Sequence, residues 1–369
     1  MQHAGETFTA CLTKTLKKTC MKKILTAVIA SLSMAANAAA ADNGGSLGYF
    51  LPKTAIRMSV LVEKTHTAKG QLAEYSELYF KKPGAVAEQT AYRIVGVRLA
   101  SVGVADTARH FEVAIDKKHS VFSVDCNSNG VLRAINTKAP RKAETLPFKP
   151  SPAVTPLNPR DFMSQDILAA ANLPKMAQLV AQEIYDIRDS RNQLSRGEAD
   201  FMPKDGEQLR LMYANLDRQE AALMQLFNGT VTTDTTETII TIVPQKGEER
   251  TVAFRFSKRF GLTAADDFSG EPVYLNVKDD GILTDMPDGA DIVKKEKDTF
   301  MLGVCLPGRI RLALTDHSGN TLAQYETDAA QYGKVVMLNG ALFGRKFTST
   351  LLMDDTTGSV KELKVEPLE

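Results

Sequence analysis

Tryptophan is missing from the sequence, and histidine and cysteine are scarce. The missing tryptophan removes one frequent platform for sugar stacking, although tyrosine and phenylalanine remain. No two histidines stand four residues apart and none adjoins a cysteine, whereas zinc sites favour such spacings. The glycine-rich loops that cradle nucleotide phosphates are also missing. The sequence therefore predicts neither zinc chemistry nor nucleotide binding.

A long apolar run is lacking too, because no stretch reaches the roughly 20 residues that span a bilayer. The chain instead has a shorter pattern near its start. Lys22 and Lys23 precede the uncharged run 24–34, and small residues follow at 36–41. This order is typical of a secretory signal peptide. We expect the signal to begin at Met21 and to be cleaved near Ala38 to Ala41, giving a periplasmic or extracellular protein without a transmembrane segment.

Neither sign of charge is in large excess. Removal of residues 1–41 would reduce the 45 basic and 44 acidic side chains to 40 and 43. A protein that binds nucleic acid or an anionic membrane surface usually carries a basic patch or stripe. The composition therefore argues against both partners.

Only two of the four cysteines, Cys126 and Cys305, follow the signal. An oxidising compartment would permit a disulfide between them. Cys305, however, lies in the apolar run 300–306, as is typical of a buried free thiol. The sequence leaves both alternatives open.

Helical periodicity is concentrated between residues 174 and 227, where apolar residues recur at spacings of three, four and seven. These residues are Met176, Val180, Ile184, Ile187 and Leu194, followed by Leu209, Leu216 and Leu223. Gly197 is expected to end a first helix, and Asp205 with Gln208 to begin a second. Two helices with so short a connection are expected to form an antiparallel hairpin.

Short β-branched runs separated by turns dominate on both sides of this pair of helices. Six prolines from Pro140 to Pro159 predict an extended connector. We therefore predict an α+β fold, with two β-rich domains joined by a central antiparallel helical hairpin. The expected segments are the cleaved residues 1–41, an N-terminal α+β domain at 42–140, the connector at 141–160, the hairpin at 161–229 and a C-terminal antiparallel β domain at 230–369.

The sharpest metal-like pattern is the spacing of Asp125, Asn127 and Asn129 before Gly130, which fits the first half of a calcium loop. Position twelve is Asn136, where a calcium loop has a bidentate glutamate. The flanking residues are typical of strands, and an Asn-Gly hairpin turn accounts for the same residues. Calcium at Asp125, Asn127 and Asn129 is the one cofactor hypothesis, and the turn is the simpler alternative.

Acidic side chains gather in two further places. One group is Glu198, Asp200 and Asp205 in the expected hairpin turn, and the other is Asp279, Asp280, Asp285, Asp288 and Asp291. Both are typical of solvated turns. They are also the acids from which a carboxylate-based hydrolase site would be assembled, because active sites gather residues from distant segments.

Five short motifs occur in order along the chain, at Tyr49 to Thr54, 201–206, Leu226 to Gly229, Ala330 to Gly333 and Asp354 to Gly358. With these motifs the sequence resembles an exported family of Bacteroides-type bacteria, domain of unknown function 4831. The resemblance covers nearly all of the chain after the signal. It implies export and the predicted architecture, and it brings no activity, substrate or catalytic residue.

These patterns together predict a non-enzymatic binding or scaffold protein of the cell envelope, whose partner is another envelope protein or a glycan. Two alternatives stay open. One is a secreted hydrolase with a carboxylate-based site, and the other is an adhesion or assembly subunit.

Overall fold

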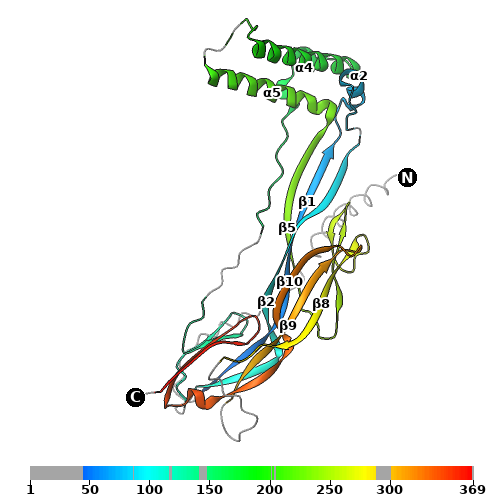
Figure 1. The fold of residues 1–369 in the computed structure, drawn as a ribbon. Coiled ribbons are helices and arrows are strands. Elements are labelled where there is room, and N and C mark those ends of the chain that lie inside the picture. Colours follow the sequence, from blue (N-terminus) through cyan, green and yellow to red (C-terminus); the bar gives the residue numbers. More distant parts are fainter. Residues whose placement is uncertain are drawn as a thin grey trace, which may run out of the picture. The chain divides into compact units, whose positions relative to one another are not determined.

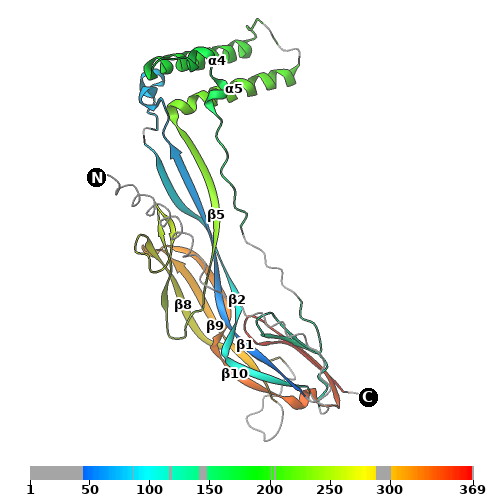
Figure 2. The same ribbon diagram turned by 180° about the vertical axis from the view of Figure 1, so that it is seen from behind.

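The computed structural model describes residues 45–85, 87–115, 119–140, 148–200, 202, 205–287 and 301–367 (Figures 1 and 2). Contacts group Gly44 to Glu369 into one unit. The chain is 50% strand and 23% helix, which confirms a β-rich architecture with several sheets and a few helices. The expected signal peptide from Met21 and its cleavage site lie outside the described residues.

A three-stranded antiparallel sheet contains β1 (Gly45–Ala68), β2 (Gln89–Ile115) and β5 (Thr230–Ile242), in the order β2-β1-β5. The alternation in β1 explains how this sheet is buried. Ile56, Met58 and Val60 are fully buried on one face, because successive side chains of a strand point to opposite faces. Burial of an apolar side chain of this size contributes roughly 1.5–3 kcal/mol to the stability of the folded state.

A five-stranded antiparallel sheet packs against that buried face. Its strands are β6 (Arg250–Ser257), β7 (Gly261–Thr263), β8 (Glu271–Leu283), β9 (Met301–Thr315) and β10 (Thr321–Asn339), in the order β10-β9-β8-β6-β7. Val273, Leu275 and Leu312 join Ile56 and Met58 in one apolar cluster between the two sheets. The residues that alternate with them lie on the opposite face.

A four-stranded antiparallel sheet contains β3 (Val124–Cys126), β4 (Leu132–Ile135), β11 (Phe347–Met353) and β12 (Val360–Pro367), in the order β12-β11-β4-β3. The 3-10 helix η3 (Gly340–Phe343) precedes β11. Leu132, Leu351 and Phe343 are fully buried with Tyr49 and Leu51 from the start of β1. This second cluster is therefore shared by the beginning and the end of the chain.

Two long helices, α4 (Leu173–Arg196) and α5 (Gly206–Asn228), occur where the periodicity predicts them. Gly197 follows α4 in the left-handed region at φ 74°, and the Asp205 side chain accepts a hydrogen bond from the backbone of Gln208 at 2.7 Å. Both end signals are therefore confirmed. No helix in the described ranges is long and apolar enough to cross a membrane.

Short helices complete this part of the molecule. They are η1 (Ala73–Tyr75), α2 (Ser76–Phe80), η2 (Pro159–Phe162) and α3 (Gln165–Leu168). Leu72 and Ile167 are buried with Val180, Ile184 and Phe227 in a third apolar cluster. The Glu220 carboxylate also joins α5 to α4, because it accepts from Arg188 at 2.7 Å and Arg191 at 3.0 Å.

Two separate β-rich domains around a central hairpin are not confirmed. Each of the three apolar clusters combines residues from before and after the connector expected at 141–160. Strand β1 also pairs with β2 on one side and with β5 on the other, although the helices lie between β2 and β5 in the sequence. The sequence patterns identify the elements, whereas their grouping depends on long-range pairing.

Candidate functional site

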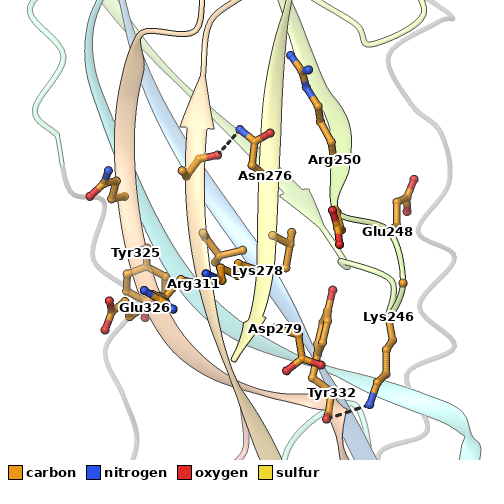
Figure 3. A pocket seen from close by; sticks show the side chains of 16 residues that line it. Lys246, Glu248, Arg250, Asn276, Lys278, Asp279, Arg311, Tyr325, Glu326 and Tyr332 are labelled. Atoms are coloured by element: carbon orange, nitrogen blue, oxygen red, sulfur yellow. Dashed lines mark hydrogen bonds between the residues drawn. The ribbon is translucent and has the colours of Figure 1, made fainter. Parts of the chain in front are cut away.

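A hollow with a volume of about 1150 Å³ lies on the face of the five-stranded sheet that points away from the apolar cluster (Figure 3). We call this surface the polar face. It is lined by strands β8, β9 and β10 and by the loop before β6. The residues that line it include Arg250, Asn276, Lys278, Arg311, Ala313, Gln324, Glu326 and Tyr332.

One row of the polar face crosses four strands. Arg250 pairs with Asn276, Asn276 with Ala313, and Ala313 with Gln324. The methyl group of Ala313 leaves space between two longer amide side chains. Asn276 is held in place, because its Nδ2 donates to the Ala313 carbonyl at 3.2 Å and to the Thr315 hydroxyl at 2.9 Å. The row is therefore a preorganised polar floor.

The adjacent row is charged. Lys278 pairs with Arg311, and Arg311 with Glu326. Arg311 is also bound by Asp280, with Nη2 2.5 Å and Nε 2.9 Å from Oδ1. These hydrogen bonds hold the pKa of Asp280 below its ordinary value and raise that of Arg311. Both groups are consequently ionised at neutral pH, and the guanidinium has a fixed position.

Aromatic rings support the rim of the hollow. The Arg250 guanidinium carbon lies 3.7 Å from the centroid of the Tyr274 ring, a cation–π contact. Tyr332 donates its hydroxyl to the carbonyl of Gln245 at 2.9 Å, and its own carbonyl accepts from Lys246 at 3.4 Å. Burial, followed by the charges of Asp279 and Glu248, raises the pKa of Tyr332 to about 12. The tyrosine is therefore a neutral anchor for the loop.

The calcium candidates lie near a second hollow of about 730 Å³, which Asp125 and Asn127 line. Asn127 Oδ1 accepts from the backbone of Asn129 at 2.9 Å and of Val131 at 3.0 Å. Asp125 Oδ2 accepts from the backbone of Ala139 at 3.1 Å. The two hydrogen bonds of Asn127 belong to the turn between β3 and β4, as the hairpin alternative predicts, whereas the Asp125 carboxylate holds the segment after β4. Calcium at Asp125, Asn127 and Asn129 stays a prediction.

Position twelve of that pattern, Asn136, has a structural role. Its Oδ1 accepts from Phe122 and Ser123, while its Nδ2 donates to the carbonyls of Ser120 and Ser349. The residue adopts a positive φ of 58°, which asparagine tolerates better than most side chains. Asn136 therefore connects the β3–β4 hairpin to β11.

Cys126 and Cys305 are both free thiols. Cys305 is fully buried, whereas Cys126 is half-buried beside the second hollow. Burial raises the pKa of each thiol to about 11. A thiol with so high a pKa is a poor nucleophile at neutral pH, because the thiolate is the reactive form.

The acidic groups expected from the sequence are separated. Asp205 caps α5, and Glu198 lies 4.0 Å from Arg196. Asp279 and Asp280 lie at the hollow or beside it, whereas Asp288 and Asp291 are outside the described residues. Within the described ranges, no three His, Cys, Asp or Glu side chains form a group that would hold a metal ion.

Three of the short sequence motifs meet around Thr54. Its hydroxyl donates to the carbonyl of Thr356 and accepts from the backbone of Ala330, both at 3.0 Å. The Gln331 amide adds two hydrogen bonds to the Thr54 backbone, at 3.0 and 2.9 Å. Gly333 packs so closely that an added Cβ would lie 1.9 Å from the carbonyl oxygen of Leu306. These motifs therefore hold the fold together.

The model of a domain-of-unknown-function family, DUF4831, matches residues 45–361. The chain belongs to the DUF4831 family. The match spans nearly all of the described residues, including the Thr54 cluster and the polar face. No curated protein and no solved structure gives a significant match. Membership in DUF4831 therefore does not indicate a function, and the function has to be inferred from the chemistry of the sites.

Sequence reasoning missed the polar face of this DUF4831 chain. The sequence signal that could have indicated this face is the alternation in 273–278 and 309–314. Val273, Leu275 and Leu312 are buried, and most of the residues that alternate with them are polar or small. The pattern identifies outward side chains strand by strand. It does not show that Lys278, Arg311 and Glu326 share one row, because register is a long-range property.

Proposed function

We propose that the chain is an exported, non-enzymatic binding protein of the cell envelope and that it recognises a glycan at the polar face. One observation supports the assignment of the polar face as the binding site. The hollow of about 1150 Å³ combines a four-strand row of polar side chains with a charged row held by Arg311 and Asp280. Export is supported by the signal-like pattern that begins at Met21.

The chemistry of the rows favours a hydroxyl-rich ligand. Asn276 and Gln324 carry amides that donate and accept, as sugar hydroxyls also do. Arg250, at the end of this row, adds a strong donor, and Glu326, in the adjacent charged row, adds a strong acceptor. Basic and acidic side chains are mixed around the hollow, which favours a neutral or weakly charged glycan over a polyanion.

Rigid positioning supports binding on strands rather than on loops. The outward side chains of β8, β9 and β10 are fixed by the sheet register, and Asn276 is further fixed by its two hydrogen bonds. Preorganised groups lose little conformational entropy when a ligand binds. Two of the acids at or beside the hollow already have partners, since Asp280 binds Arg311 and Asp279 Oδ1 accepts from Gly281 at 2.8 Å.

The test is a glycan array probed with the wild-type chain and two tyrosine variants. Ala313→Tyr fills the floor of the hollow, whereas Thr321→Tyr places the same side chain at an exposed position on β10 that does not line it. We expect wild type and Thr321→Tyr to bind the same glycan, and Ala313→Tyr to lose about tenfold or more in affinity. Equal binding by all three proteins would exclude the polar face.

The same proteins, together with Asp279→Asn, distinguish a glycan from a protein ligand and binding from hydrolysis. Capture of one envelope protein by wild type but not by Ala313→Tyr would make the ligand a protein and overturn the glycan. If the wild type cleaved the bound glycan, and Asp279→Asn still bound the glycan but did not cleave it, the protein would be a hydrolase and the non-enzymatic role would be wrong. All three variants need melting temperatures close to that of the wild type for these comparisons.

A further inference from the structure

We call residues 148–158 the strap. Its first residues, from Phe148 to Ser151, contact the outer face and the β5 edge of the three-stranded sheet. The outer face is the side away from the first apolar cluster, with the row Gly96, Leu61 and Glu237. An added Cβ at Gly96 would lie 2.8 Å from the Phe148 ring. The Arg98 guanidinium carbon lies 5.7 Å from the centroid of that ring. The ring therefore occupies a gap that exists because Gly96 has no side chain.

Three residues further on, the strap pairs with the edge of the sheet. The backbone of Thr235 donates to the Ser151 carbonyl at 2.9 Å, and the Ser151 backbone donates to the Thr235 hydroxyl at 2.7 Å. Strand β5 is an edge strand of its sheet. Two strand spacings are about 9.6 Å, and three extended residues span about 10 Å. Lys149 and Pro150 therefore cross the row that contains Leu61 and Glu237.

The strap is held at few points. Residues 149–156 are all exposed, and Pro150, Pro152 and Pro156 have no N–H with which to extend a ladder along β5. A strand without proline in the same place would form more backbone hydrogen bonds. Proline at a sheet edge also discourages unwanted pairing, so a permanent cover is the simpler explanation of the strap.

A strap that covered the sheet permanently would not explain the environment of the Glu237 carboxylate. Both of its carboxylate oxygens are buried without a hydrogen-bond partner. Nearby cations on the outer face are engaged elsewhere, because Arg93 lies 2.7 Å from Glu63 and Arg98 lies over Phe148. No ion pair joins Lys149 to Glu237 in the described part of the chain. A buried carboxylate without a partner destabilises the covered state, and a cation would remove that penalty.

We propose that the strap is a replaceable occupant and that the outer face is a docking site for an extended strand of a partner protein. The partner strand inserts an aromatic side chain at Gly96, places a lysine or arginine at Glu237, and pairs its backbone with the edge of β5. This is β-strand addition, in which the main chain supplies affinity and the side chains supply specificity. The site is separate from the polar face and does not depend on its ligand.

The test uses a labelled synthetic peptide, FKTSTAVTT, which keeps the aromatic, lysine and serine spacing of the strap but replaces its prolines by threonine. Binding to the full chain is measured by fluorescence anisotropy. Phe148→Ala removes the ring and loosens the strap, so we expect it to bind the peptide about tenfold more tightly than the wild type. Gly96→Leu in the Phe148→Ala background fills the gap and should abolish binding.

The charge is tested separately. Glu237→Gln in the Phe148→Ala background should weaken binding of the lysine peptide, whereas a peptide with methionine in place of lysine should bind both proteins equally. Failure of the peptide to bind Phe148→Ala, with the circular dichroism melting curve intact, would overturn the proposal. Binding unaffected by Gly96→Leu and Glu237→Gln would do the same. An intermolecular disulfide in the Ser151→Cys/Thr235→Cys variant would make a second copy the occupant and also overturn it.

Discussion

Replacement of Thr54 by valine should destabilise the chain strongly although the two side chains have nearly the same shape. Thr54 is fully buried, and its hydroxyl joins the carbonyl of Thr356 to the backbone N–H of Ala330. Valine leaves both groups without a partner inside the protein. Each unsatisfied buried group costs about 1–3 kcal/mol, so we expect the free energy of unfolding to fall by roughly 2–6 kcal/mol.

The assay is urea unfolding monitored by circular dichroism, with the free energy of unfolding obtained by linear extrapolation. Thr54→Ser keeps the hydroxyl and should lose only about 1 kcal/mol, for one methyl group. Thr236→Val makes the same chemical change at an exposed position of β5 and should change stability by less than about 0.5 kcal/mol. If Thr54→Val were as stable as Thr236→Val, the Thr54 cluster would not hold the three motifs together.

Three further predictions concern the strap, the helices and calcium. Gly96→Ala should displace Phe148 and speed proteinase K cleavage within 149–156, whereas Gly206→Ala, where an added Cβ meets no atom within 4 Å, should leave cleavage unchanged. Burial opposes ionisation of Glu220, but hydrogen bonds from Arg188 and Arg191 prevail and lower its pKa, so its stabilising effect is present above the ordinary glutamate pKa and is lost as pH falls. The stability difference between wild type and Glu220→Gln should therefore shrink from pH 7 to about pH 3. Millimolar calcium should leave the melting temperature unchanged if Asp125, Asn127 and Asn129 form only a turn, and a rise that Asn129→Ala removes would establish the calcium site.

The helices could be predicted from sequence because their signals are local. Gly197 and Asp205 act within one helical turn of their own positions, and α4 and α5 end and begin beside them. The buried alternation of Ile56, Met58 and Val60 was equally visible. Each of these features depends on neighbours in the chain rather than on distant segments.

The arrangement of the strands could not be predicted in the same way. Pairing of β1 with β5 joins Ile56 to Ile242, and no pattern in either strand specifies that partner. The Thr54 cluster likewise joins residues separated by more than 270 positions. The motifs were visible as residues, but their shared structural role required the long-range contacts.

The candidate sites also differ in whether they depend on local sequence signals or on long-range contacts. The alternation of Asp125, Asn127 and Asn129 predicted oxygen-rich chemistry. The structure shows that Asn127 accepts backbone hydrogen bonds of a turn and that Asp125 accepts one from Ala139, after β4. The polar face has no compact motif, because Arg250, Asn276, Ala313 and Gln324 come from four strands. Sites built across a sheet are not recognisable from the spacing of residues along the chain.

The most direct test of binding at the polar face is hydrogen–deuterium exchange of the full chain with and without the glycan selected by the array. We expect ligand-dependent protection in segments 274–280, 309–315 and 321–327, which carry the two rows of the hollow, and none in Ala313→Tyr. Protection confined to 123–139 around the second hollow, or protection that persists in Ala313→Tyr, would contradict the assignment of the polar face as the ligand site.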